Sequence, residues 1–132
     1  MDIPKRPVKI LVLEDNFQWQ TIIREVARVC GITNVVIVDS IQGFRDKFSP
    51  GEFRAVLLDN QVIDGEAIRK GLAEWVRWHD DGIRIGLISG SNLQTAPMTR
   101  AVYLGKNDSN INDFLREIAN PKVMAQKNSG SR

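Results

Sequence analysis

The sequence predicts an α/β protein built on a five-stranded, doubly wound parallel sheet. Two observations lead to this prediction. Short apolar runs rich in β-branched residues alternate along the chain with amphipathic segments, which is the pattern of a parallel sheet whose strands are connected by helices. Four of the five runs are nearly continuously apolar, as expected for strands that are covered by helices on both faces. The expected strands are 9–13, 35–38, 55–58, 83–88 and 101–104.

Helical patterns follow the strands. The first helix is expected between Asn16 and Gly31, where apolar residues recur at helical spacing and include Trp19 and Cys30, both expected in the core. In the segment 91–100, polar residues and Pro97 allow at most a short helix that starts near that proline. The other expected helices are 41–48, about 66–79, and a last one that ends at 118 and is capped by Asp108 or Ser109.

Length and composition indicate one ordinary domain. The chain has 132 residues, 42% hydrophobic and 26% charged, which are average values for a soluble globular protein. We expect an N-terminal extension over 1–6, the domain over 7–118, and a flexible tail or linker over 119–132. No apolar run approaches the 18 residues of a membrane span. Cys30 is the only cysteine, which excludes an intrachain disulfide and suits a reducing cytoplasm.

The charge distribution gives little support to nucleic-acid binding. The chain has a net charge of +2, but the expected domain over 7–118 holds 13 basic and 15 acidic residues. The positive excess therefore belongs to the chain ends, and no clustered basic face is apparent. We expect no nucleic-acid partner and no membrane partner for this domain.

Acidic residues follow two of the expected strands. Glu14 and Asp15 come after the first strand, and Asp59 follows the third. In the strand order 2-1-3-4-5, one of the few that such a chain allows, these two strands are neighbours at the topological switch point, where ligands bind. Three carboxylates in one cleft repel each other unless a cation binds, and a donor set made only of oxygen favours Mg²⁺.

A hydroxyl and an ammonium are expected at the same edge of the sheet. Ser89 follows the fourth strand and Lys106 follows the fifth. Acids, a metal ion, a hydroxyl and a lysine together make a site for a phosphoryl group.

These residues resemble the receiver domain of two-component response regulators over roughly residues 7–118. The pair Glu14-Asp15, Asp59, Ser89 and Lys106 each fall where receivers have their site residues, with 44 residues from Asp15 to Asp59 and 30 from Asp59 to Ser89. The resemblance implies the flavodoxin-like strand order 2-1-3-4-5.

The resemblance also implies a role for each residue. Asp59 would be the phosphoacceptor, and Asp15, Asp59 and the backbone carbonyl of Gln61 would be direct Mg²⁺ ligands, with Glu14 acting through water. Lys106 would offset charge on the phosphoryl oxygens. Ser89 would bind one of these oxygens after transfer, and Tyr103 would change its packing with that movement. The implied partners are a histidine kinase or phosphotransfer protein and a downstream protein, and the implied role is signalling in the cytoplasm rather than enzymatic turnover of a substrate.

The sequence departs from the receiver pattern in three places. Ile63 stands where receivers commonly have a proline, in a loop about two residues short. Asn107 follows Lys106 in place of a proline in a cis peptide, so we expect either a trans bond with a shifted Lys106 or a strained bond. The interval from Ser89 to Lys106 is also short, and the missing residues come from the fourth helix.

Two alternatives stay open at this point. The departures favour an interaction module that keeps the receiver fold with weak or no phosphorylation. A Mg²⁺-dependent phosphohydrolase of the haloacid-dehalogenase type would need an acidic residue two positions after the nucleophile, where this chain has Gln61.

Overall fold

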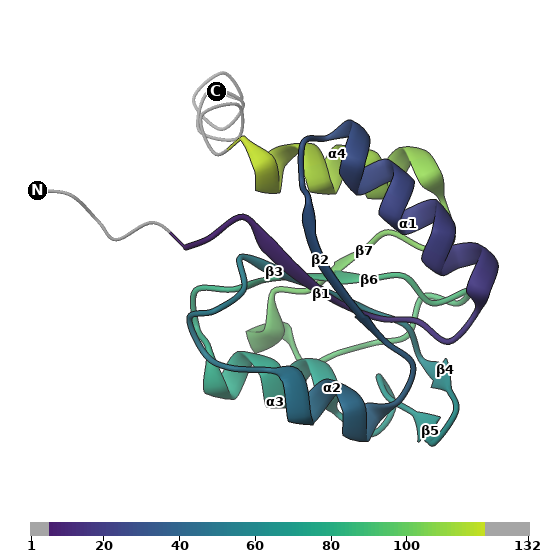
Figure 1. Cartoon of the computed structure of the whole chain (residues 1–132). Coiled ribbons are helices and arrows are strands. Elements are labelled where there is room, and N and C mark those ends of the chain that lie inside the picture. Colours follow the sequence, from purple (N-terminus) through teal and green to yellow (C-terminus); the bar gives the residue numbers. More distant parts are fainter. Residues whose placement is uncertain (1–5, 121–132) are drawn as a thin grey trace, which may run out of the picture.

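A five-stranded parallel sheet forms the centre of the molecule (Figure 1). The computed structural model describes residues 6–120. The strand order is β2-β1-β3-β6-β7, and the separate strands β4 (Gln61–Val62) and β5 (Gly65–Glu66) pair as an antiparallel hairpin. Without the hairpin this is the order 2-1-3-4-5, so the predicted fold class is confirmed. The sheet strands are β1 (Lys9–Leu13), β2 (Asn34–Val38), β3 (Ala55–Leu58), β6 (Arg84–Leu87) and β7 (Val102–Tyr103).

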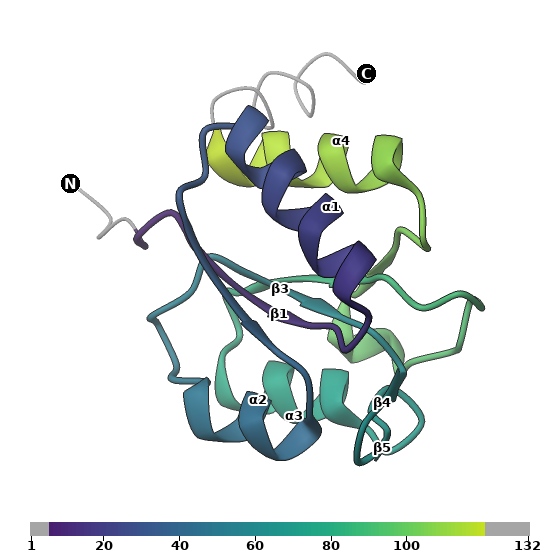
Figure 2. The same cartoon turned by 45° about the vertical axis from the view of Figure 1, so that its right-hand side comes forward.

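Helices cover both faces of the sheet. Helices α1 (Phe17–Val29) and α4 (Asp108–Ala119) lie on one face, and α2 (Ile41–Lys47) and α3 (Leu72–His79) lie on the other (Figures 1 and 2). Successive strand residues therefore enter two separate cores. Leu11 and Leu13 join the cluster under α2 and α3, while Ile10 joins the cluster under α1 and α4. This is why the strands are apolar at nearly every position.

The fourth helix of the predicted pattern is reduced to a single 3₁₀ turn. The turn η1 spans Pro97–Thr99, as expected for a short helix starting near Pro97. It lies against α3, because the guanidinium of the buried Arg77 donates a hydrogen bond to the carbonyl of Thr99 over 2.9 Å.

The third helix begins later than predicted. We expected it from about residue 66, but α3 starts at Leu72. The cause is Asn60, whose side-chain oxygen accepts hydrogen bonds from the backbone N–H groups of Ile68 and Arg69 over 2.9 and 3.1 Å. These bonds hold the residues after Asn60 in turns. The helix starts only after Gly71, its N-cap, whose φ of 86° lies in the left-handed region that glycine adopts readily.

The ends of α4 also correct the prediction. Its N-cap is Asn107, whose side chain accepts a hydrogen bond from the backbone N–H of Asn110 over 3.0 Å, and not Asp108 or Ser109. The cap position suits asparagine because its side chain satisfies a free N–H in the first turn. The helix extends to Ala119, one residue into the segment expected as a tail. Asn120 caps the helix, and residues 121–132 of the expected tail lie outside the described residues, as does most of the expected N-terminal extension.

One ion pair and several hydrogen bonds join Arg6 to the domain. Both carboxylate oxygens of Asp80 accept hydrogen bonds from the guanidinium of Arg6, each over 2.6 Å. The same carboxylate accepts from the backbone N–H groups of Gly51 and Gly82 over 3.0 and 3.3 Å. The Asp80 side chain is only 4% exposed. Arg6, which we expected in the N-terminal extension, is therefore bound to the folded domain.

Substituting Gly86→Ala is expected to destabilise the protein by about 1–3 kcal/mol, because the core has no room for another methyl group. A Cβ atom there would lie 2.8 Å from a side-chain carbon of Leu104 and 2.9 Å from one of Leu57. Urea unfolding of the variant measures the change. Gly51→Ala is an unsuitable control because its φ of 81° adds strain, whereas Gly90→Ala has open space and an ordinary φ. Equal stability of the Gly86 and Gly90 variants would contradict this packing argument.

None of the helices within residues 6–120 has the length and apolar character needed to cross a bilayer.

Candidate functional site

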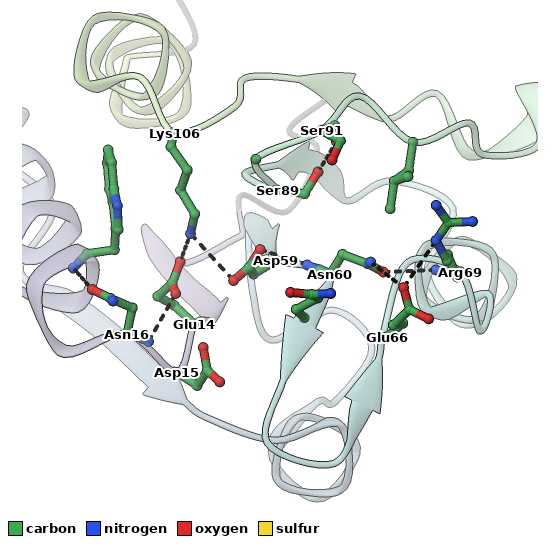
Figure 3. A pocket seen from close by; sticks show the side chains of 14 residues that line it. Glu14, Asp15, Asn16, Asp59, Asn60, Glu66, Arg69, Ser89, Ser91 and Lys106 are labelled. Carbon is green, nitrogen blue, oxygen red and sulfur yellow. Dashed lines mark hydrogen bonds and ion pairs between the residues drawn. The ribbon is translucent and has the colours of Figure 1, made fainter.

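A polar cleft of about 440 Å³ opens at the carboxyl ends of β1, β3 and β6. This is the edge where the parallel strands end and where ligands bind in doubly wound sheets. Figure 3 shows the side chains that line it. The lining residues are Glu14, Asp15, Asn16, Trp19, Asp59, Asn60, Gln61, Glu66, Arg69, Ser89, Gly90, Ser91, Leu93 and Lys106.

The three predicted acids converge in this cleft. One carboxylate oxygen from each of Glu14, Asp15 and Asp59 lies within 4.8 Å of the others. Glu14 is fully buried and Asp59 is 7% exposed, whereas Asp15 is exposed. Asp15 forms no hydrogen bond or ion pair with another of the residues 6–120. The cluster therefore has two buried carboxylates at its base and one free carboxylate at its mouth.

Lys106 reaches into the acid cluster from the loop after β7. Its ammonium forms an ion pair with Glu14 and a second one with Asp59, 3.4 Å from that carboxylate (Figure 3). The structure has no cis peptide bond within residues 6–120, so the bond between Lys106 and Asn107 is trans. The trans bond leaves the lysine in contact with both acids, and Asn107 serves as the α4 cap instead.

Burial raises the pKa of Glu14. Loss of solvent is the largest cause, and the neighbouring Asp59 charge adds to it, while hydrogen bonds from Lys106 and from the backbone N–H of Asn16 oppose the rise. Three carboxylates and one ammonium leave a formal charge of −2, so a single divalent cation would neutralise the group.

The residues present fit a hard divalent cation such as Mg²⁺. The donors are carboxylate oxygens, and no histidine or cysteine lines the cleft. Their spacing allows the three oxygens to share one ion, and the excess negative charge favours it. Gln61 lies in β4 and lines the cleft, and the use of its backbone carbonyl as a further ligand stays a prediction.

Asp59 is held in place by backbone groups. Its backbone N–H donates to the carbonyl of Leu13 over 3.1 Å, which joins β3 to β1 beside the acid pair. One carboxylate oxygen accepts a hydrogen bond from the N–H of Asn60 over 2.8 Å, and Lys106 contacts the other. The Asp59 carboxylate is thus oriented from both sides, with its accessible surface toward the cleft.

Ser89 lines the cleft, whereas Tyr103 does not line it and contacts the Ser89 loop. The Ser89 hydroxyl donates a hydrogen bond to the backbone carbonyl of Ser91, so it is bound within its own loop (Figure 3). The hydroxyl of Tyr103 donates to the carbonyl of Ser89 over 3.3 Å. Tyr103 is 37% exposed, and this bond connects the edge strand directly to the Ser89 loop.

Several lining residues were not predicted from the sequence. Asn60 organises the loop after β3, and the ion pair between Arg69 and Glu66 lies at the same end of the cleft. Trp19, expected in the core, is half-buried: it packs against the core cluster under α1 and α4 and also forms part of the cleft wall. Cys30, also expected in the core, is half-buried, and its thiol lies 3.2 Å from Oδ1 of Asn112. The closely spaced Gly65 and Gly71 were the one sequence signal for the irregular loop.

The chain has the fold of response regulator receiver domains. A CheY-like receiver domain protein from Methanospirillum hungatei JF-1 superposes with a TM-score of 0.67 and 21% identity over 94% of this chain and 100% of that chain. A receiver domain protein from Clostridium thermocellum gives a TM-score of 0.64 and 16% identity over 90% and 99%. The Mn²⁺-bound form of response regulator Rcp1 gives 0.56 and 17% over 85% and 91%.

Sequence comparison gives no further relatives: no protein-family model matches the chain, and no curated protein matches it. The predicted likeness to receivers is thus confirmed at the level of the fold.

Proposed function

We propose that this chain is a phosphoacceptor receiver of a two-component phosphorelay. Asp59 accepts the phosphoryl group with Mg²⁺ held by Asp15, Asp59 and the backbone carbonyl of Gln61, and by Glu14 through water. A protein partner reads the resulting change of surface. The observation that carries the proposal is the position of Asp59, whose carboxylate lies at the base of the cleft, 3.4 Å from the Lys106 ammonium and within 4.8 Å of the other two acids.

The chemistry that follows is a transfer to oxygen. A carboxylate oxygen of Asp59 attacks the phosphorus of a phosphohistidine on a histidine kinase or phosphotransfer protein. The phosphorus–nitrogen bond breaks, and its electron pair stays with the donor imidazole. Bound Mg²⁺ supplies charge neutralisation and orientation for the phosphoryl oxygens. Lys106 offsets the charge on a further oxygen, and Asn60 keeps the acceptor carboxylate oriented through its backbone N–H.

The signal would leave the site through the Ser89 loop. When the Ser89 hydroxyl leaves the carbonyl of Ser91 and donates to a phosphoryl oxygen, the new bond would draw the loop inward and move the carbonyl of Ser89 with it. Tyr103 donates a hydrogen bond to that carbonyl, so a movement of the carbonyl would change the packing of Tyr103 on the edge strand β7. This is a local switch that biases a two-state surface.

We also propose a cellular location and a domain organisation for the protein. We place the protein in the cytoplasm as a signalling module that at most catalyses its own phosphotransfer and dephosphorylation. The residues over 7–118 would form the receiver, between the segments 1–6 and 119–132.

Phosphoryl uptake tests this proposal. The wild-type protein incubated with acetyl phosphate and Mg²⁺ is expected to gain one phosphoryl group by intact-mass measurement, and the Asp59→Asn variant to gain none. Asp113→Asn is the matched control, because Asp113 is exposed on α4, outside the cleft. An Asp59→Asn protein that gains the group as the wild type does would refute the acceptor assignment.

A second candidate function is an interaction module with little or no phosphorylation. The observation in its favour is the hairpin β4–β5, which with the Asn60 turns takes the place of the predicted start of the third helix beside Asp59. The two candidates differ in whether the acid cluster binds a metal ion.

Mg²⁺ is therefore expected to raise the melting temperature of the wild-type protein, since a ligand that binds only the folded state stabilises it by about 2.7 kcal/mol at a hundred times its Kd. Asp15→Asn is expected to raise the metal-free melting temperature slightly, because Asp15 has no hydrogen bond or ion pair with residues 6–120 to lose and its charge repels Glu14 and Asp59, and to reduce the shift caused by Mg²⁺. A wild-type protein that shows no shift would favour the interaction module.

A further inference from the structure

Trp19 lies in the wall of the acidic cleft. It belongs to the first turn of α1, and its indole ring faces the ammonium of Lys106, with Nζ 5.3 Å from the ring centroid. The same ammonium contacts Glu14 and Asp59. Lys106 is thus surrounded by two carboxylates and one aromatic face, and its side chain is 23% exposed.

Asn16 forms hydrogen bonds with both Trp19 and Glu14. The side-chain oxygen of Asn16 accepts a hydrogen bond from the backbone N–H of Trp19 over 3.0 Å. The backbone N–H of Asn16 donates to Glu14 over 3.1 Å. The N-cap of α1 therefore fixes both the start of the helix that carries the indole and the carboxylate that binds Lys106.

The two attractions on Lys106 respond differently to charge in the cleft. A divalent cation shared by Glu14, Asp15 and Asp59 would cancel much of the attraction between those carboxylates and the ammonium. The attraction of the indole face for a cation arises from the ring quadrupole and does not depend on the carboxylates. The contact with Trp19 therefore persists in the state in which Lys106 must meet a phosphoryl oxygen.

We propose that Trp19 is a positioning residue that holds the Lys106 ammonium in the cleft once the acids are neutralised. This inference rests on the proposed function for the part that concerns phosphoryl transfer. Trp19 takes no direct part in the transfer and acts only through Lys106.

A double-mutant cycle tests the inference. The rate constant for phosphoryl uptake from acetyl phosphate at saturating Mg²⁺ is measured for the wild type, Trp19→Leu, Lys106→Met and the double variant. Trp19→Leu is expected to slow uptake by roughly threefold to tenfold, the range of a half-desolvated cation–π contact. It is expected to have no effect in the Lys106→Met background. Trp19→Phe should retain part of the rate, and Trp78→Leu, at a side chain 80% exposed, should retain all of it.

Fluorescence, measured without metal and again at saturating Mg²⁺, gives a readout that needs no phosphodonor. Lys106→Met is expected to change the tryptophan emission of the wild type but not that of Trp19→Leu, which keeps only Trp75 and Trp78. Equal slowing by Trp19→Leu in both backgrounds, or an emission change that survives the loss of Trp19, would overturn the inference. A wild-type protein that gains no phosphoryl group refutes the proposed function instead, and the emission comparison at saturating Mg²⁺ then decides alone whether Trp19 holds Lys106 once the acids are neutralised.

Discussion

Substituting Lys106→Met is expected to slow phosphoryl uptake at Asp59 by about 10²- to 10³-fold, the usual effect of removing one charged or hydrogen-bonding group that stabilises a transition state. Lys106 is the cation that this chain itself contributes to the acid cluster, since its ammonium contacts both Glu14 and Asp59. Methionine keeps an unbranched chain of similar length and removes only the charge. Quenched-flow or manual sampling with intact-mass detection gives the rate constant.

The control for this prediction is Lys70→Met. Lys70 is an exposed lysine that does not line the cleft, so its substitution is expected to leave the rate unchanged. If the Lys106→Met and Lys70→Met proteins were phosphorylated at the same rate, Lys106 would have no part in the transfer. That result would contradict the role proposed for its ammonium in the cleft.

Substituting Asp80→Asn is expected to destabilise the protein by about 2–3 kcal/mol. Breaking a buried ion pair by removing one partner commonly costs about 3–5 kcal/mol, and the partial exposure of Arg6, 28%, reduces that figure through solvent screening. The amide keeps the size of the side chain but leaves Arg6 without its bidentate acceptor. Urea unfolding measures the loss, and Asp81→Asn, at a side chain 91% exposed, is the matched control.

The same carboxylate gives the stability a pH dependence of known sign. Burial alone would raise the pKa of Asp80, but the hydrogen bonds from Arg6, Gly51 and Gly82 outweigh it, and the pKa lies below its usual range. Because the folded state holds the ionised form, the contribution of Asp80 is present at neutral pH. It is lost as the pH falls from about 5 through the lowered pKa. The Asp80→Asn protein should lose less stability than the wild type over this interval, and an equal loss would contradict the assignment.

The sheet and the acid cluster could be predicted from the sequence because both depend on local patterns. Each strand is an apolar run, and a site residue that directly follows a run must lie at the carboxyl edge of the sheet. That reasoning placed Glu14, Asp15 and Asp59 together, and the structure confirms that they meet within 4.8 Å. The roles of these residues in phosphoryl transfer remain predictions.

The irregular parts could not be predicted because they depend on contacts between distant residues or on the choice of a single side chain. The late start of α3 follows from the hydrogen bonds of Asn60 to a turn eight and nine residues away. Trp19 packs against the core cluster, as its place in an apolar helical stripe predicts, but its second role in the cleft wall depends on Lys106, which lies far along the chain. The ion pair of Arg6 with Asp80 spans 74 residues and has no sequence signature.

Mapping the modified residue tests the central claim most directly. The protein is treated with acetyl phosphate and Mg²⁺, and the acyl phosphate is then reduced with borohydride, which converts a phosphorylated aspartate to homoserine. Peptide mass spectrometry is expected to find homoserine at position 59 alone. Homoserine at another aspartate, or none in a protein that remains folded and binds Mg²⁺, would contradict the claim that Asp59 is the phosphoacceptor.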